Sequence, residues 1–512
     1  MSIPVIDLFS GPGGLGEGFS SHGGENAFRI VLSAEMDPAA QATLQLRSYF
    51  RRVRVDNRDA KAYYDFCHGE SGTPWNSRTE SAWRDAADEA RLITLGTPEG
   101  NATLDSALRV RMKKQAECVL IGGPPCQAYS LVGRSRNLGI AGYRAEDDHR
   151  HFLYREYLRV IQRYRPAVFV MENVKGILSS RIGGEKIFNS ILADLADPDA
   201  ALTSHKGKRS SCYRIHSLVT TTTFDRDMNP LDINLRDFII RTEDHGIPQA
   251  RHRVILVGVR EDINLAPHSI AKSDTTTVAS AIGDLPRLRS RLSKVPDSAV
   301  QWAGVVRDHL HELAHEARTA GMLPLAKGLE RSARSIDSNL ECGGTRYARE
   351  LLSATDNNTL TRKLRDRRLH VVLNHEARSH MSSDLRRYGY AATFAQSFGT
   401  SPKGHTEFFL AGLRPNHANW ESGKFADRFR VQLWDRPSTT VTSHISKDGH
   451  YFIHPDPRQC RSLTVREAAR LQTFPDNYFF QGNKTQQYAQ VGNAVPPLLA
   501  SKIAHVVQTL LR

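Results

Sequence analysis

Short runs of mostly apolar residues, without polar alternation, are the main pattern along the chain. They occupy residues 3–9, 30–32, 119–121, 168–171 and 254–259. Runs of this kind are typical of strands buried on both faces, as in a parallel sheet. Amphipathic stretches such as residues 152–164 lie between them, so strands and helices alternate. The pattern predicts an α/β fold with a doubly wound, mostly parallel, Rossmann-like sheet.

The same pattern divides the chain into parts. Residues 1–260 carry the predicted sheet, and the polar residues 61–116 are interpreted as an insert. Residues 261–435 have mixed periodicity and many Arg and His residues, which predicts a second, smaller domain. Residues 436–512 are more regular, end in an apolar helix and are expected to return to the first domain.

The ends of the first two runs suit a ligand that contains a nucleoside. Residues 11–16 read Gly-Pro-Gly-Gly-Leu-Gly, and Glu35 and Asp37 follow the second run. Glycines let a backbone approach a ligand closely, and a carboxylate can accept hydrogen bonds from a ribose diol. Nicotinamide cofactors and S-adenosylmethionine share these requirements. The loop alone therefore leaves both open, together with a tight turn that binds nothing.

The third run leads into Gly122-Gly123-Pro124-Pro125-Cys126-Gln127, which presents one cysteine behind two prolines. Binding and catalytic groups of open α/β sheets lie at this edge, beyond the carboxyl ends of the strands. Backbone amides and basic surroundings lower a thiol pKa. We therefore interpret Cys126 as a reactive thiolate and not as core filling.

Glu172 ends the fourth run and is a candidate proton donor. A structural carboxylate paired with an arginine is the alternative. Arg251 and Arg253 suit such pairing, because side chains two residues apart lie on one face of an extended segment. A solvated edge of basic side chains is the other interpretation of these two arginines.

Composition indicates a partner and a compartment. The 512 residues include 69 Lys and Arg against 55 Asp and Glu, and the formal charge of +14 favours a polyanionic partner such as nucleic acid. The 6 cysteines form no Cys-x-x-Cys pair, which favours a reducing compartment. The sequence starts without a basic, apolar leader, and no apolar run is long enough to span a bilayer. We expect a cytoplasmic, nucleoid-associated protein with no membrane partner.

Three motifs, in order, resemble those of the DNA (cytosine-5) methyltransferases. They are Pro124-Pro125-Cys126-Gln127, Met171-Glu172-Asn173-Val174 and Gln249-x-Arg251-x-Arg253. Further segments resemble the family's opening cofactor loop, its helix after the cysteine loop and its late motifs: residues 7–14, 150–156, 436–440, 463–475 and 490–495. The resemblance covers roughly residues 1–60, 117–260 and 436–512, with the motifs in the family's usual order.

The resemblance implies an enzyme that transfers a methyl group from S-adenosylmethionine to C5 of cytosine within a specific sequence of double-stranded DNA. Cys126 would add to C6 of the base, and Glu172 would donate a proton to N3 with Arg253 as its partner. Arg251 and Asn173 would help to hold the ring and the loop.

The resemblance also implies S-adenosylmethionine as the cofactor and places several residues in its pocket. These are Phe9, Gly11, Gly13, Leu15, Glu35, Met36, Asp37, Asp59, Pro125, Leu153, Asn493 and Val495. Asp59 belongs to a loose version of the family's third motif, and the segment 61–116 is not usual in the family.

Residues 261–435 resemble the family's variable target recognition domain. Within them Asn374-His375-x-x-Arg378-x-His380, followed by residues 383–388, predicts either a helix start that binds a phosphate or a solvated helix face. His311-Glu312-x-x-His315 matches a zinc-protease pattern. The His-x-x-Gly-x-x-His extension does not follow, since position 318 is Arg, so we predict no metal site.

The expected partner is double-stranded DNA, and we expect a monomer. The sequence leaves open whether a cognate restriction endonuclease or defence-system proteins accompany the enzyme. The alternatives are a catalytically silent DNA-binding regulator with the same fold, an RNA cytosine-5 methyltransferase and a nicotinamide oxidoreductase. Intact Cys126, Glu172 and both arginines argue against the first. The last explains neither the Pro-Pro-Cys-Gln motif nor the basic charge.

Overall fold

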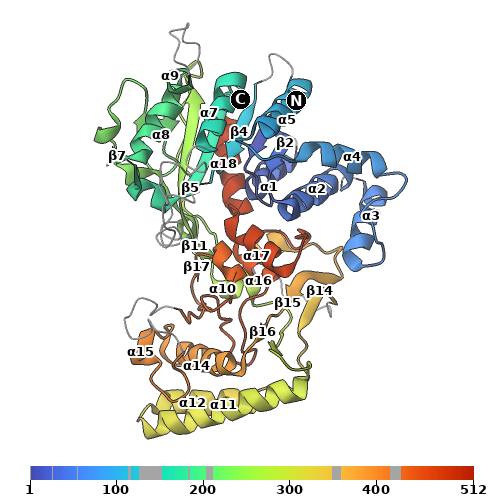
Figure 1. The fold of residues 1–512 in the computed structure, drawn as a ribbon, viewed down its shortest axis with the longest axis vertical. Helices are drawn as coiled ribbons and strands as arrows, with labels where there is room; N and C mark the ends of the chain where they lie inside the picture. The colour runs from blue at the N-terminus through green and yellow to red at the C-terminus, as the bar shows by residue number, and fades with distance from the viewer. Residues whose placement is uncertain are drawn as a thin grey trace.

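The molecule has an upper lobe that holds a sheet and a lower lobe made mostly of helices (Figure 1). The computed structural model describes residues 2–25, 27–54, 56–112, 117–125, 153–182, 185–202, 212–348, 359–415 and 428–512. Cys126 lies outside the described residues, and so do residues 150–152 of the motif that follows it.

One sheet of the upper lobe contains nine strands of the described residues. They are β1 (Ile3–Leu8), β2 (Phe28–Glu35), β3 (Ala90–Leu92), β4 (Val119–Gly122), β5 (Val168–Val174), β8 (Tyr213–His216), β9 (Thr223–Phe224), β10 (Ile239–Arg241) and β12 (His252–Arg260). Their order is β3-β2-β1-β4-β5-β12-β8-β9, with β10 also beside β12. The first five are parallel, and the rest pair antiparallel. This confirms the predicted Rossmann-like fold and puts the carboxyl ends of five strands at one edge.

The apolar runs are buried on both faces of the sheet, as predicted. Val119 and Val168 belong to the core of one face, and their neighbours Leu120 and Phe169 belong to the core of the other. The first face is covered by α1 (Gly14–Ser21) and α18 (Pro497–Leu510), and the second by α5 (Pro98–Arg111), α7 (Leu153–Tyr164) and α8 (Ile187–Ala196). The sheet is therefore doubly wound. Smaller elements of this lobe are β6 (Arg181–Ile182), β7 (Glu185–Lys186) and α9 (Pro198–Leu202).

Part of the segment interpreted as an insert belongs to the sheet. Strand β3 pairs with β2, with Leu92 opposite Glu35, and α5 packs on the sheet through Leu104 and Leu108. Three residues are too few to leave a visible apolar run, which is why the sequence pattern missed this strand. The rest of the segment forms a small core beside the sheet with α2 (Pro38–Val53), α3 (Asn57–His68) and α4 (Glu80–Glu89).

Long helices build the core of the lower lobe (Figure 1). They are α11 (Ala299–Thr319), α12 (Leu323–Arg334) and α14 (Ser382–Phe398), with the short α15 (Gly404–Glu407) beside them. Ile453 and Cys460 also belong to this core, whereas Val278 packs against the C-terminal segment. The limits of this core thus differ from residues 261 and 435, because the chain crosses between the lobes more than once.

Short elements connect the two lobes. They are α10 (Val278–Ile282), α13 (Thr359–Leu364), α16 (Val465–Leu471), α17 (Lys484–Asn493) and the pairs β11 (Gln249–Ala250) with β17 (Ser438–Thr439), β13 (Arg291–Leu292) with β16 (Ser379–His380), and β14 (Gly343–Ala348) with β15 (Val371–Glu376). The β11–β17 pair attaches the returning C-terminal segment directly in front of β12.

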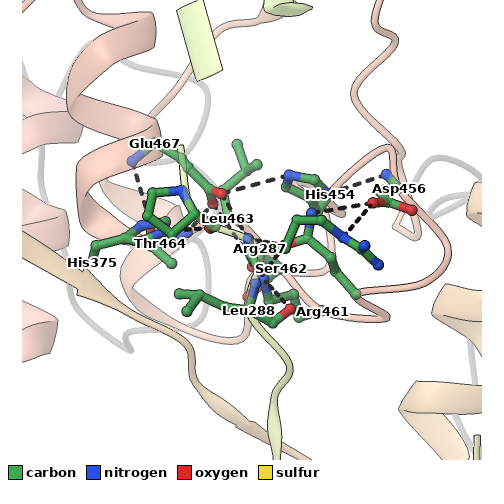
Figure 2. A network of polar contacts seen from close by, with 12 residues as sticks. Arg287, Leu288, His375, His454, Asp456, Arg461, Ser462, Leu463, Thr464 and Glu467 are labelled. Atoms are coloured by element: carbon green, nitrogen blue, oxygen red, sulfur yellow. Dashed lines mark hydrogen bonds and ion pairs between the residues drawn. The ribbon is translucent and has the colours of Figure 1, made fainter. Parts of the chain in front are cut away.

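A buried polar network fixes the start of α16 (Figure 2). Arg461 donates to both carboxylate oxygens of Glu467, at 2.8 and 2.7 Å, and Glu467 closes a capping box with Thr464. His454 lies 3.5 Å from Glu467, and His375 shares a hydrogen bond with the Thr464 hydroxyl. Burial alone would raise the pKa of Glu467, but Arg461 holds this pKa far below its usual value. The carboxylate therefore stays charged inside the junction.

The basic residues around 386 are buried and do not face solvent. Arg386 and Arg387 are each 7% exposed. Arg386 pairs with Glu312 and Glu316 of α11, and Arg387 pairs with Asp384. The predicted helix start is confirmed, since α14 begins at Ser382, but Arg386 and Arg387 neither form a solvated face nor remain free for a phosphate, because carboxylates of the same lobe pair with them. Among the described residues, no three His, Cys, Asp or Glu side chains come together as they would around a metal ion.

Candidate active site

The loop after β1 has the backbone of a ligand-binding turn. Phe9, Gly11 and Gly13 have positive φ angles of 54°, 56° and 95°. This region is strained for Phe9 and free of strain for glycine. A Cβ at Gly14 would lie 2.1 Å from the carbonyl oxygen of Val495, so only glycine permits this contact. The side chains of Leu15 and Val495 are buried in the sheet core below the loop.

Glu35 bonds the glycine loop to the end of β2. Its Oε2 accepts the Gly11 N–H at 2.8 Å, and its Oε1 accepts the N–H groups of Met36 at 2.9 Å and Asp37 at 2.8 Å. Burial raises the pKa of Glu35, and these N–H groups act against that shift. Asp37 does not contact the glycine loop through its side chain. Its Oδ1 accepts the Ala40 N–H at 2.8 Å and so caps α2.

Two apolar side chains stand exposed at neighbouring strand ends. Met36 after β2 is 62% exposed, and Leu92 at the end of β3 is 55% exposed. A Cβ at Gly96 would lie 2.9 Å from Leu153 Cδ2, so Leu153 lies against the loop that follows β3. The structure thus gathers Met36, Leu92 and Leu153 around the same end of the sheet. Leu92 was not among the predicted site residues, because the short strand β3 was not predicted.

Asp59 lies elsewhere. Helix α2 has 16 residues and carries the chain about 24 Å from the strand ends before α3 begins. Asp59, in the first turn of α3, accepts a hydrogen bond from Arg78 at 2.9 Å. This position does not support its assignment to the cofactor pocket, and the strand end after β2 in the sheet order is that of β3.

Asp7 is an acid that was not among the predicted site residues. It lies in β1 directly before the glycine loop and is 1% exposed. Neither carboxylate oxygen has a hydrogen-bond partner among the described residues. A Cβ at Gly16 would lie 2.9 Å from Asp7 Oδ2, and burial raises the pKa of Asp7 to about 8. A lone acid within an otherwise apolar strand was the signal in the sequence.

The turn after β4 meets the end of β5. Asn173 donates from Nδ2 to the Pro124 carbonyl at 3.2 Å, and a Cβ at Gly123 would lie 3.0 Å from Glu172 Oε2. Pro125 is half-buried and ends this described stretch, immediately before Cys126. Glu172 and Asn173 therefore flank the turn that leads to the cysteine.

Arg253 orients Glu172 from the neighbouring strand. Its Nε lies 2.9 Å from Glu172 Oε1, and each side chain is 11% exposed. Burial lowers the pKa of Arg253, and Glu172 opposes that shift. The pair holds one carboxylate oxygen and leaves Oε2 directed at Gly123. A carboxyl group in this arrangement can donate a proton to a base held above the turn.

Arg251 connects the site to the C-terminal segment through hydrogen bonds. It is 1% exposed and donates to the carbonyl oxygens of Val441 at 2.6 Å and Gly492 at 3.1 Å. Burial holds the pKa of Arg251 well below its usual value. Asn493 follows Gly492 and is exposed at the end of α17. Arg251 thus positions Gly492, the residue before Asn493, while Arg253 forms an ion pair with Glu172.

A comparison with known proteins identifies the family of the chain. The family described as C-5 cytosine-specific DNA methylase matches residues 96–199 and 220–509. The chain belongs to this family. It is a DNA (cytosine-5-)-methyltransferase.

Relatives of the methylase match it from end to end. The type II methyltransferase M.Bpa9945I of Bacillus paralicheniformis is 32% identical, over 99% of each chain. The DNA (cytosine-5-)-methyltransferase M.ApeKI of Aeropyrum pernix is 26% identical, over 99% of this chain and 98% of its own. A crystal structure titled as a prophage-encoded DNA modification methyltransferase of E. coli has a TM-score of 0.53 at 19% identity. It covers 100% of this chain and 99% of its own, and it supports the fold alone.

The methylase has no helix, in the parts of the chain that the structure describes, with the length and apolar character needed to cross a membrane.

Proposed function

We propose that the methylase transfers the methyl group of S-adenosylmethionine to C5 of cytosine in a specific sequence of double-stranded DNA, through a covalent bond between Cys126 and C6. The observation that carries the proposal is the placement of Glu172. Arg253 holds one of its oxygens, and the other faces the turn that leads to Cys126. A cytosine above this turn would meet a nucleophile and a proton donor together.

The steps follow from these positions. The Cys126 thiolate adds to C6 while Glu172 donates a proton to N3, so that the negative charge is not left on the ring. C5 then takes the methyl group, which the cofactor supplies when bound. Water takes the C5 proton, the C5–C6 double bond forms again and the thiolate leaves C6, while N3 returns its proton to Glu172. Cys126 and Glu172 are thereby left unchanged. One difficult step is thereby split into easier ones.

The residues around the glycine loop support S-adenosylmethionine as the cofactor. The unpartnered Asp7 carboxylate would hold the cationic amino group, and Glu35 would accept from the ribose hydroxyls. Met36, Leu92 and Leu153 would contact the adenine, since all three lie around the ends of β2 and β3. Asp37 would act through α2, which it caps. Phe9, Gly11, Gly13, Pro125 and Asn493 would complete the pocket.

Double-stranded DNA is the partner that the charge of +14 and the family favour. The relatives include proteins that are named type II methyltransferases. They favour a restriction–modification context for this chain, in which a nuclease reads the same site.

Trapping on a modified substrate tests the mechanism. Duplex DNA with 5-fluorocytosine at the target should form a stable adduct with the wild type, because fluorine cannot leave C5 as a proton. Cys126→Ala should form no adduct and transfer no methyl group. The control Cys212→Ala removes another thiol and should behave as the wild type. Full activity of Cys126→Ala would overturn the mechanism, and bisulfite sequencing of DNA from expressing cells would identify the methylated site.

A further inference from the structure

A basic hollow lies beside the helices that follow the glycine loop, and the proposed reaction does not use it. It measures about 380 Å³ and is bordered by α1, the start of α18 and residues 360–368. The cationic residues that line it outnumber the acidic ones: Arg47, Arg54, Lys363, Arg365, Arg367 and Arg368 against Glu17 and Asp366. We call it the basic hollow.

Glu17 and Asp366 neutralise only part of this set, and Arg365 pairs at 2.7 Å with Asp284, which does not line the hollow. Glu17 is taken up by Arg47, whose guanidinium lies 2.6 Å away. Asp366 lies 3.6 Å from Arg368. Lys363 and Arg367 are exposed, and within the described ranges neither forms a hydrogen bond or an ion pair. Two exposed cations therefore remain at the rim.

Like charges also meet around the hollow. Burial lowers the pKa of Arg54, Glu17 and Tyr64 oppose that shift, and the nearby Arg368 adds to it. Burial and Lys363 together lower the pKa of Lys502, which follows the lining residue Ser501. Cations crowded in this way raise the free energy of the empty hollow, and an anion would relieve the repulsion.

Helix α18 adds a further positive potential. It has 14 residues, and its first two, Pro497 and Leu498, line the hollow. The N-terminal end of a helix carries a partial positive charge and attracts anions.

We propose that the basic hollow binds phosphate groups. Guanidinium groups suit phosphate because they present several N–H donors in one plane, and lysine adds a compact charge. Two sources share this chemistry: backbone phosphates of DNA that extends beyond the target site, and a free polyphosphate. Both are separate from the cytosine site, so the proposal does not depend on the role of Cys126.

The test compares Lys363→Gln/Arg367→Gln with Arg362→Gln. Arg362 is exposed on α13 beside Lys363 but does not line the hollow, so it controls for charge removal at the same surface. All these side chains are exposed, and thermal unfolding of each variant verifies that the fold is kept. Inorganic tripolyphosphate is the first probe, in calorimetric titration. We expect the double variant to bind it at least about tenfold more weakly, since two charged hydrogen-bond donors are lost. The control should stay within about twofold of the wild type.

The second probe distinguishes the two sources. Duplexes of increasing length that contain the target are titrated over a range of salt concentrations. If DNA occupies the hollow, the double variant lowers the slope of log K against log salt by about 0.9 per lost contact, for long duplexes only. If a free polyphosphate occupies it, tripolyphosphate binding weakens and the DNA slope is unchanged. A double variant that matches Arg362→Gln with both probes overturns the proposal.

Discussion

Opposed strands bring Glu172 and Arg253 together. Strands β5 and β12 pair antiparallel with Ile255 opposite Glu172, and Arg253 lies two residues along on the same face. The contact uses Glu172 Oε1 and leaves Oε2 toward Gly123. Arg253 thus holds Oε1 in place, and Oε2 remains available to a substrate, as a proton donor requires.

Removal of the Glu172 carboxyl proton should lower the methylation rate and leave the affinity for the cofactor unchanged. We expect Glu172→Gln to lower the single-turnover methylation rate by about 10²–10⁴-fold, because glutamine keeps the shape but has no transferable proton. Calorimetry should show an affinity for S-adenosylmethionine close to that of the wild type. Glu261→Gln, at an exposed position just after β12, serves as the control. An unchanged single-turnover rate would reassign Glu172 to a structural role.

At the scale of elements, glycines decide how closely two helices approach. A Cβ at Gly14 would lie 2.1 Å from the Val495 carbonyl oxygen, and one at Gly18 would lie 2.3 Å from Ala500 Cβ. Helix α1 can therefore pack on α18 only with glycine at position 18, and on the segment just before α18 only with glycine at position 14. Gly304 of α11 differs, because a Cβ there would meet nothing within 4 Å.

Substitution by alanine should change the free energy of unfolding in opposite directions at Gly14 and at Gly304. Gly14→Ala should lower the free energy of unfolding by about 1–3 kcal/mol and weaken cofactor binding, because Val495 must move. Gly304→Ala should raise the free energy of unfolding by about 0.5–1 kcal/mol, since alanine favours the helix. Chemical denaturation of both variants measures these changes. Equal stability of the two variants would contradict the packing argument.

The polar network around α16 makes the junction sensitive to acid. Burial lowers the pKa of His375 and of His454 to about 4 each. An unfolded histidine titrates near pH 6.5, so between pH 6.5 and 4 the unfolded chain binds protons that the folded chain does not. The free energy of unfolding should therefore fall as pH decreases through this window, by up to about 1.4 kcal/mol per pH unit for each histidine.

Urea unfolding at pH 7.5, 6 and 5 measures this dependence. His454→Asn should flatten it, because asparagine does not titrate, and His405→Asn, at an exposed position, should leave it unchanged. A wild-type slope retained in His454→Asn would show that other groups dominate.

In the whole molecule, the chain crosses between the lobes and closes each core with distant segments. The lower core takes in Ile453 and Cys460, while the glycine loop of the upper lobe rests on Val495. Arg251 bonds the start of β12 to Val441 and Gly492. The lobes are thus held by contacts between residues that are far apart in the sequence.

Sequence specificity should reside in residues 261–435. Exchange of this segment for that of a curated relative should move methylation to the relative's site, as bisulfite sequencing would show. A second chimera that also carries residues 436–462 keeps Ile453 and Cys460 with their lower core, and it should be the more stable of the two. An active chimera that still methylates the original site would contradict the assignment of specificity.

Much of the sheet could be predicted from the chain, and the exceptions have physical causes. Strands buried on both faces lack polar alternation, which made β1, β4 and β12 visible. Strand β3 is a three-residue edge strand and left no such run. Arg251 and Arg253 were expected to share a face, but their partners lie on different segments. Periodicity predicts the face of a strand on which a side chain lies. It does not predict which distant group that side chain contacts.

Motif order and local chemistry alone were enough to indicate the family, the cysteine turn and the glycine loop. These features depend on neighbours in the chain and on the reactivity of single side chains. Only the folded chain showed that Glu35 binds the glycine loop while Asp37 caps α2, and that Arg386 is buried against α11. The Asp37 cap is a local contact, but the contacts of Glu35 and Arg386 join residues that are 24 and 70 positions apart in the chain. At such separations burial and competition between partners decide, and no local pattern contains that information.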